Sequence, residues 1–89
     1  MNEKIYSFSA RIIKVEDMDA AYVEVPFDVK KEFNKGRLKV KATFDDEEYD
    51  GVVCKMGTPN YIIGIRKDIR KKIGKQVGDT IKVTIKERE

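Results

Sequence analysis

The sequence predicts a mainly-β fold with two short helices, and three features of its 89 residues predict it. Apolar and polar residues alternate along most of the chain, which is the period of a strand with one buried face. Two stretches break this alternation and carry the i, i+4 spacing of a helix. These two stretches also resemble each other, and each lies between two strand patterns. We therefore expect one domain over residues 1–89.

Six strands are expected along the chain. The first holds Tyr6, Phe8 and Ala10 on one side, and Ile13 then changes the parity, which a bulge or a bend explains. Two later strands alternate strictly, and the remaining three are short and rich in Val, Ile and Tyr. In chain order the expected strands cover residues 5–15, 20–25, 37–44, 48–56, 60–65 and 80–86.

The pattern of a β-α-β unit occurs twice in the chain, over about residues 20–45 and 60–88. The first copy matches the second at a constant offset of 40, and three extra residues in the second copy raise the offset to 43 in its last strand. The matched pairs are Val25 with Ile65, Asp28 with Asp68, Val29 with Ile69, Phe33 with Ile73, Asn34 with Gly74 and Val40 with Val83. This ordered pattern indicates an internal duplication.

Each copy carries the signals of a short helix. Pro26 is expected at the first helical position, where its missing N–H costs nothing, and Arg66 takes that place in the second copy. An aspartate follows in the first turn, where it meets the positive end of the helix dipole. Asn34 and Gly74 should end the helices, because both tolerate the left-handed conformation. At about eight or nine residues, neither helix would persist without packing.

Composition excludes several chemistries. The chain has no His and one cysteine, Cys54, so neither an internal disulfide nor a Cys/His zinc site can form. We expect no catalytic residues, no metal site and no cofactor. Cys54 shares parity with Val52 and is expected to be a small buried apolar side chain. Without a signal-peptide pattern or an apolar run of about 20 residues, the protein is expected to be cytoplasmic, with no membrane partner.

Two family resemblances rest on these stretches. The stretch IGIRKDIRKKIGKQVGDTIKV resembles the swapped-hairpin motif of AbrB/MazE-type transcription factors, with Arg66 in place of the usual Pro. Over nearly the whole chain, YVEVPFDV, KMGTP and YIIGIRKDIRKKIGKQVGDTIKVTI resemble the domain of unknown function 1905. These resemblances imply a double-split β-barrel, in which two AbrB-like β-α-β halves of one chain form a pseudo-dimer.

Charge is placed unevenly, at −3 over residues 1–54 (nine Lys/Arg, twelve Asp/Glu) and +6 over residues 55–89 (ten and four). The second helix region carries the densest group of cations, and they are candidate contacts for nucleic-acid phosphates. These residues are Arg66, Lys67, Arg70, Lys71, Lys72 and Lys75. A solvated helix face explains them equally, since cations are favoured near a helix C-terminus.

Three other features have both a functional and a structural interpretation. Arg37, Lys39 and Lys41 could contact a polyanion or form a solvated sheet face that discourages edge pairing. The acidic run at 45–50 lacks the spacing of a calcium loop and predicts a hairpin turn. The loop at 55–61 either connects two strands or forms the rim of a small pocket. The candidate rim residues are Tyr22, Gly57, Thr58, Pro59 and Tyr61.

The sequence therefore predicts a non-catalytic binding or interaction module whose ligand it does not identify. The alternative is a DNA-binding regulator of the AbrB-like type, which rests on the fold resemblance and on the basic second half. The partner stays open between DNA, a protein and a small ligand. Nothing in the sequence points to an enzyme.

Overall fold

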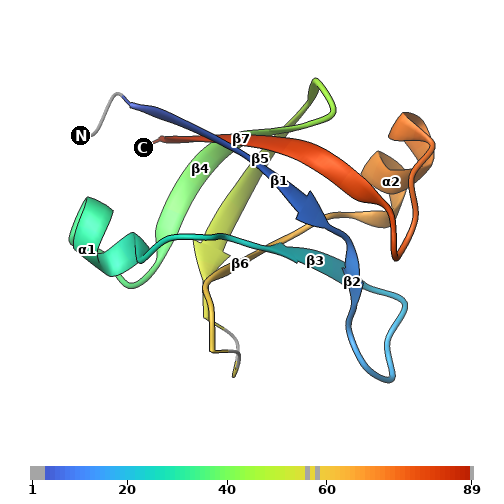
Figure 1. The fold of residues 1–89 in the computed structure, drawn as a ribbon, viewed down its shortest axis with the longest axis horizontal. Coiled ribbons are helices and arrows are strands. Elements are labelled where there is room, and N and C mark those ends of the chain that lie inside the picture. Colours follow the sequence, from blue (N-terminus) through green and yellow to red (C-terminus); the bar gives the residue numbers. More distant parts are fainter. Residues whose placement is uncertain (1–3, 56, 58, 89) are drawn as a thin grey trace.

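In the computed structural model, residues 4–55, 57 and 59–88 are described. They form a strongly curled antiparallel sheet, a half-barrel, with two short helices at its opposite ends (Figure 1). The elements are β1 (Ile5–Arg11), β2 (Ile13–Lys14), β3 (Ala21–Glu24), α1 (Val29–Phe33), β4 (Leu38–Phe44), β5 (Glu47–Cys54), β6 (Ile62–Gly64), α2 (Lys67–Ile73) and β7 (Thr80–Glu87). The sheet order is β1-β7-β4-β5-β6-β3-β2. The mainly-β prediction with two short helices is confirmed.

The sheet curls because its two end strands are neighbours in the chain. Only Ile12 separates β1, which pairs with β7, from β2, which pairs with β3. The Ile12 backbone donates a hydrogen bond to the Asp79 carbonyl and accepts one from the Gly78 amide, both at 2.9 Å. The Ile12 side chain is buried. The change of parity after Ile12 thus marks a bend, and one predicted strand is divided into two.

The core lies on the concave face of the curled sheet. Alternate residues of β4 and β7 point into it, as the period-two pattern predicted. The inward residues of these two strands are Leu38, Val40, Ala42, Phe44, Ile81, Val83 and Ile85, and all are buried. Removing such a side chain from water contributes about 1.5–3 kcal/mol for Val, Leu, Ile or Phe. Buried residues of α1 and α2 join the same core.

Both helices are shorter than predicted, and both begin later, α1 at Val29 and α2 at Lys67. Asp28 is the N-cap of α1, with φ −81° and ψ 102°, and its side chain accepts a hydrogen bond from the Lys31 amide at 3.2 Å. Pro26 therefore precedes the helix and is not its first residue, and Asp28 caps it from outside the first turn. The reason is that Asp28, in extended backbone, accepts a hydrogen bond from a free N–H of the first turn with its side chain. A proline side chain has no acceptor for such a bond. Arg66 is the N-cap of α2, with no side-chain cap bond.

The helix ends and the hairpin turn follow the predictions. Asn34 and Gly74 end the helices in the left-handed conformation, at φ 58° and φ 70°. Asp45 and Asp46 form the turn between β4 and β5, both with positive φ. Two such residues match the right-handed twist of the flanking strands. The rest of the acidic run belongs to β5 and is not part of the turn.

The prediction that Cys54 is buried is wrong. Cys54 is half-buried on the outward face of β5, while the buried side chain is that of its neighbour Val53. Period two gives the two faces of a strand but does not say which one the curl turns inward. Among the described residues, no helix has the length and apolar content to cross a membrane.

Candidate functional site

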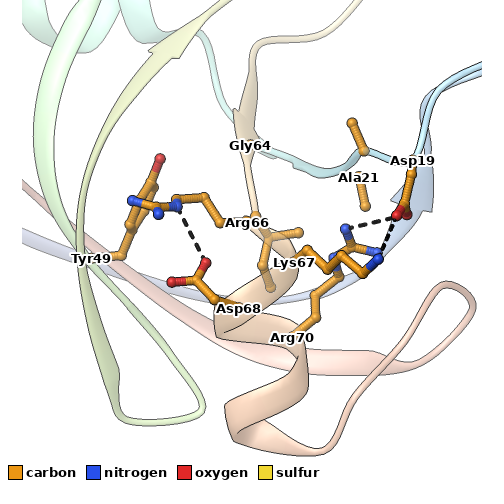
Figure 2. Close-up of a pocket in the computed structure, with 10 residues that line it drawn as sticks. Asp19, Ala21, Tyr49, Gly64, Arg66, Lys67, Asp68 and Arg70 are labelled. Carbon is orange, nitrogen blue, oxygen red and sulfur yellow. Dashed lines mark ion pairs between the residues drawn. The ribbon is translucent and has the colours of Figure 1, made fainter.

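A cleft of about 500 Å³ opens where α2 meets the ends of β3 and β6 (Figure 2). It combines three cations with two carboxylates, one aromatic ring and several small residues. The lining residues are Asp19, Ala20, Ala21, Tyr49, Gly64, Ile65, Arg66, Lys67, Asp68 and Arg70.

The sheet and the core together position the cleft. The Ile65 amide donates to the Ala21 carbonyl at 3.0 Å, which joins the end of β6 to the start of β3. The chain enters α2 directly after this bond, and Ile69 anchors the helix in the core. Arg70 then runs from α2 toward Asp19 on the loop before β3, as Figure 2 shows.

Arg70 is the most unusual side chain of the cleft. Its side chain is only 12% exposed, and its Nε and Nη2 atoms are buried without a hydrogen-bond acceptor in the described part of the chain. The nearest carboxylate contact is the 4.0 Å separation between Arg70 Nη2 and Asp19 Oδ1, too long for a hydrogen bond. A buried donor without an acceptor costs about 1–3 kcal/mol, and more when the group is charged. The Arg70 guanidinium is thus poorly satisfied by its own protein.

Asp19 faces Arg70 but is held mainly by another cation. Lys67 Nζ lies 2.8 Å from Asp19 Oδ2. That hydrogen bond and the charge of Lys67 lower the pKa of the Asp19 carboxyl below its ordinary value, with smaller contributions from Arg70 and Lys14. Asp19 is therefore an exposed carboxylate at neutral pH, turned toward the same guanidinium that an incoming anion would approach.

The other wall of the cleft is formed by Tyr49 and the exposed pair of Arg66 and Asp68. Arg66 Nε lies 3.2 Å from Asp68 Oδ1 at the rim. Tyr49 is half-buried, 5.9 Å from the ring of Phe44. A Cβ at Gly51 would come within 2.6 Å of the Tyr49 ring, so this ring position requires a glycine there. Three cations against two carboxylates leave the cleft with one net positive charge.

The structure divides the six predicted phosphate contacts into two groups. Arg66, Lys67 and Arg70 come together at the cleft, whereas Lys72 and Lys75 face the acidic residues of the hairpin formed by β4 and β5. The distances are 2.9 Å from Lys72 to Glu47 and 3.9 Å from Lys75 to Asp45. The Glu47 hydrogen bond raises the pKa of Lys72. Lys71 is exposed and forms no ion pair with any described residue.

Ion pairs within the molecule therefore balance much of the charge asymmetry along the chain. Asp19 in the loop before β3 lies against Lys67 of α2, and Glu47 at the start of β5 lies against Lys72 of the same helix. Asp45 in the turn between β4 and β5 lies 3.9 Å from Lys75, just after α2. The acidic turn residues form no metal cluster either, because the described residues contain no group of three or more acidic or thiol side chains placed to hold an ion.

The cationic face of β4 lies on the outside of the sheet. Lys39 and Lys41 are exposed there, and Lys41 stands opposite Asp50 on one side and Lys86 on the other. Arg37 lies just before β4 and is exposed. These residues do not line the cleft beside Arg70.

The predicted pocket rim is distributed over two places. Pro59 and Tyr61 line a second hollow, also of about 500 Å³, at the start of α1, where Lys55 Nζ lies 4.9 Å from the Tyr61 ring centre. Tyr22 lines a smaller apolar hollow on the outer face of the sheet. Gly57 adopts a positive φ of 74° in the loop, and Thr58 lies outside the described residues.

The family described as Domain of unknown function (DUF1905) matches residues 8–85. The chain belongs to the DUF1905 family. No curated protein matches it. The DUF1905 match spans every residue that lines the cleft beside Arg70, so the cleft is built within the family domain.

Sequence reasoning missed most of the cleft. Asp19 and Tyr49 stand far from α2 in the chain, and neither lies in a motif that suggests a site. The available signal was the excess of cations in the second copy, which has Arg66 and Lys72 where the first has Pro26 and Glu32. That signal pointed to phosphates on a surface and not to a buried guanidinium.

Proposed function

We propose that this domain is a non-catalytic module that binds a small anion, a carboxylate or a phosphate, in the cleft beside Arg70. The observation that carries the proposal is the buried guanidinium whose Nε and Nη2 lack acceptors among the described residues. A guanidinium presents its N–H groups in a planar fork that matches the oxygens of a carboxylate or phosphate. An anion in the cleft would supply the acceptors that Arg70 lacks.

The surroundings of Arg70 support a reversible binding site. Lys67 and Arg66 add positive charge at the rim, and Asp19 acts as an internal competitor that is too distant to hydrogen-bond Arg70. The lining residues offer no nucleophile joined to a general base, since Asp19 and Asp68 each face a cation. The cleft therefore suits binding better than catalysis.

Nuclear magnetic resonance tests the proposal directly. Acetate and inorganic phosphate, titrated separately into nitrogen-15-labelled protein at low chloride, should shift the Arg70 Nε–H resonance saturably, together with the amides of Lys67 and Asp19. Arg70→Met should abolish the saturable shifts. Lys30→Met, the exposed counterpart in α1, should leave them unchanged. If neither anion moves the Arg70 resonance, the proposed function is wrong.

We also propose that the two halves descend from one β-α-β unit and pair as a pseudo-dimer in a double-split barrel. Strand β3 pairs with β6, and β4 pairs with β7, so each unit exchanges strands with the other. Val23 stands opposite Ile63, its own equivalent at the offset of 40, and Ala42 stands opposite Ile85, its equivalent at the offset of 43. A residue that pairs with its own equivalent lies on a local two-fold axis, and both pairs support the duplication.

The two larger hollows give the same support. Residues 19–21 and 64–68 line the cleft beside Arg70, and residues 59–61 and 24–28 line the hollow at α1. Each residue of one set differs from its counterpart in the other by 40. The cleft and the hollow are thus equivalent places in the two proposed halves.

DNA binding as an AbrB-like regulator stays a prediction. Five of its six proposed contacts, all except Lys71, lie 4.0 Å or less from a carboxylate, and phosphates would have to displace these partners. Titration of a random DNA duplex at two salt concentrations tests it, because phosphate contacts give an affinity that falls with salt. Because the buried Arg70 guanidinium favours a small anion, we put small-anion binding before DNA binding.

A further inference from the structure

A small apolar hollow adjoins the cleft beside Arg70. It has a volume of about 250 Å³ and lies on the outer face of β3, β5 and β6. Its lining residues are Val15, Met18, Ala20, Ala21, Tyr22, Val52, Cys54, Ile62 and Gly64. Three of them, Ala20, Ala21 and Gly64, also line the cleft. The cationic cleft and the apolar hollow therefore border each other at these small residues.

Gly64 sits at the junction of the two spaces, and the fold itself does not require a glycine there. Its φ is not in the positive range, and a Cβ built at this position would approach only the Ala21 carbonyl oxygen, at 4.0 Å. Glycine inside a strand costs stability and often marks the close approach of another molecule. Tyr22 is the cross-strand partner of Gly64, and both residues line the hollow.

Met18 extends the apolar surface at the rim of the hollow. It is 60% exposed on the loop between β2 and β3, the loop that also carries Asp19. A flexible thioether suits contact with ligands of varied shape. The same short loop thus offers an apolar side chain to the hollow and a carboxylate to the cleft.

We infer that the ligand is an amphipathic anion whose carboxylate or phosphate binds Arg70 and whose apolar body crosses Gly64 into the hollow. This inference rests on the proposed function of the cleft. The anionic head group is assigned to the cleft because the cleft has a net positive charge and contains the unsatisfied Arg70 guanidinium. The apolar body is assigned to the neighbouring hollow because Ala20, Ala21 and Gly64 line both spaces.

Three probes separate the two parts of the ligand. Octanoate carries both a carboxylate and an apolar chain, acetate carries the carboxylate alone, and 1-octanol carries the chain alone. Octanoate should bind at least about tenfold more tightly than acetate, since each methylene taken out of water contributes roughly fourfold. Octanoate should shift the Arg70 Nε–H resonance and also the amides of Tyr22, Cys54 and Gly64, whereas acetate should leave these three amides unshifted.

Gly64→Val is the deciding variant. Its side chain enters open space and should block the junction, so that the protein loses its preference for octanoate over acetate. Gly36→Val is the matched control, because Gly36 also has open space for a Cβ and no positive φ, but lies outside both spaces. Met18→Ser, at an exposed position that the core does not need, should weaken octanoate binding several-fold.

The outcomes distinguish this inference from the proposed function. If acetate and octanoate bind equally, or if Gly64→Val and Met18→Ser leave the preference for octanoate intact, the amphipathic ligand is ruled out and the anion cleft stands. If 1-octanol binds as tightly as octanoate, the charged head is not needed and the inference is equally overturned. If neither anion shifts Arg70, both proposals fall.

Discussion

The hollow at the start of α1 and the cleft at the start of α2 occupy matching positions in the chain but have opposite net charge. Glu24, Asp28 and Lys55 give the hollow one net negative charge, whereas the cleft has one net positive charge. The hollow is bordered by Pro26 and Phe27, where the cleft has Arg66 and Lys67. Further along α1, Lys30 is exposed, whereas its counterpart Arg70 in α2 is nearly buried. Positions 40 residues apart thus carry packing residues at one end of the sheet and a charged, unsatisfied group at the other.

The aromatic residues of the first half explain the difference. Phe27 stacks on Tyr6 at 4.7 Å between ring centres, and Phe33 lies 5.2 Å from the same ring. The Tyr6 hydroxyl donates to Glu32 Oε2 at 3.2 Å. Aromatic packing of this kind stabilises the α1 end of the sheet. The α2 end lacks such a cluster among the described residues, and charge occupies its place. The comparison supports a division in which one end stabilises the fold and the other carries the proposed anion site.

The largest expected effect is on the stability of the α1 end. Phe33→Ala should lower the free energy of unfolding by about 3 kcal/mol, because it empties a buried site within the aromatic cluster. Ile73→Ala, at the equivalent position of α2, should cost only about 1–2 kcal/mol, since Ile73 is half-buried. Urea unfolding of both variants measures the difference. Equal losses would contradict the division between the two ends.

The two equivalent aspartates should differ by about 1 kcal/mol. Asp28→Ala removes the N-cap hydrogen bond of α1 and should cost about 1 kcal/mol. Asp68→Ala removes only an exposed ion pair with Arg66, which contributes little in water. Thermal unfolding of the two variants checks this order. A larger loss for Asp68→Ala would mean that α2 depends on its rim charges.

The smallest expected effect on stability concerns Asp19, and it depends on pH. Its pKa is lowered in the folded state, so its stabilising contribution is complete above the ordinary aspartate pKa and is lost as the pH falls through the folded-state value. The contribution is small because the carboxylate is exposed. Unfolding of Asp19→Asn between pH 2 and 7 should show a slightly flatter acid limb than the wild type. A steeper limb would contradict the assigned direction.

Asp19→Asn should have a clearer effect on binding than on stability. Removing the internal competitor raises the net charge of the cleft, so acetate should bind several-fold more tightly at pH 7, as the Arg70 resonance would report. The matched control is Glu16→Gln, an exposed acid on the same loop that does not line the cleft. Weaker acetate binding in Asp19→Asn would mean that Asp19 helps to hold the anion.

Local signals predicted most of the fold. Strand alternation gave the inward residues of β4 and β7, and the left-handed preference of Asn34 and Gly74 gave the helix ends. The predicted start of α1 was wrong because it followed the preference of proline for the first helical position, whereas Asp28 caps the helix two residues later. Cys54 was placed in the core because parity alone does not tell which face a curled sheet buries.

The candidate site was less predictable than the fold because it depends on contacts between distant segments. The sequence showed that α2 is basic but not that Arg70 is buried, which depends on the loop carrying Asp19. Tyr49 reaches the cleft only through the pairing of β4 with β5, and it needs Gly51 beside its ring. The position of Gly64 between the cleft and the apolar hollow is visible only in the folded structure.

The free energy of unfolding of Arg70→Met, measured in urea with and without saturating acetate, tests the central claim most directly. If Arg70 serves a ligand, the variant without acetate should be as stable as the wild type or up to about 1–2 kcal/mol more stable, because an unsatisfied buried charge is removed. Acetate should then stabilise the wild type but not the variant. A clear loss of stability in Arg70→Met, with no effect of acetate on the wild type, would show that Arg70 is a structural residue and contradict the account.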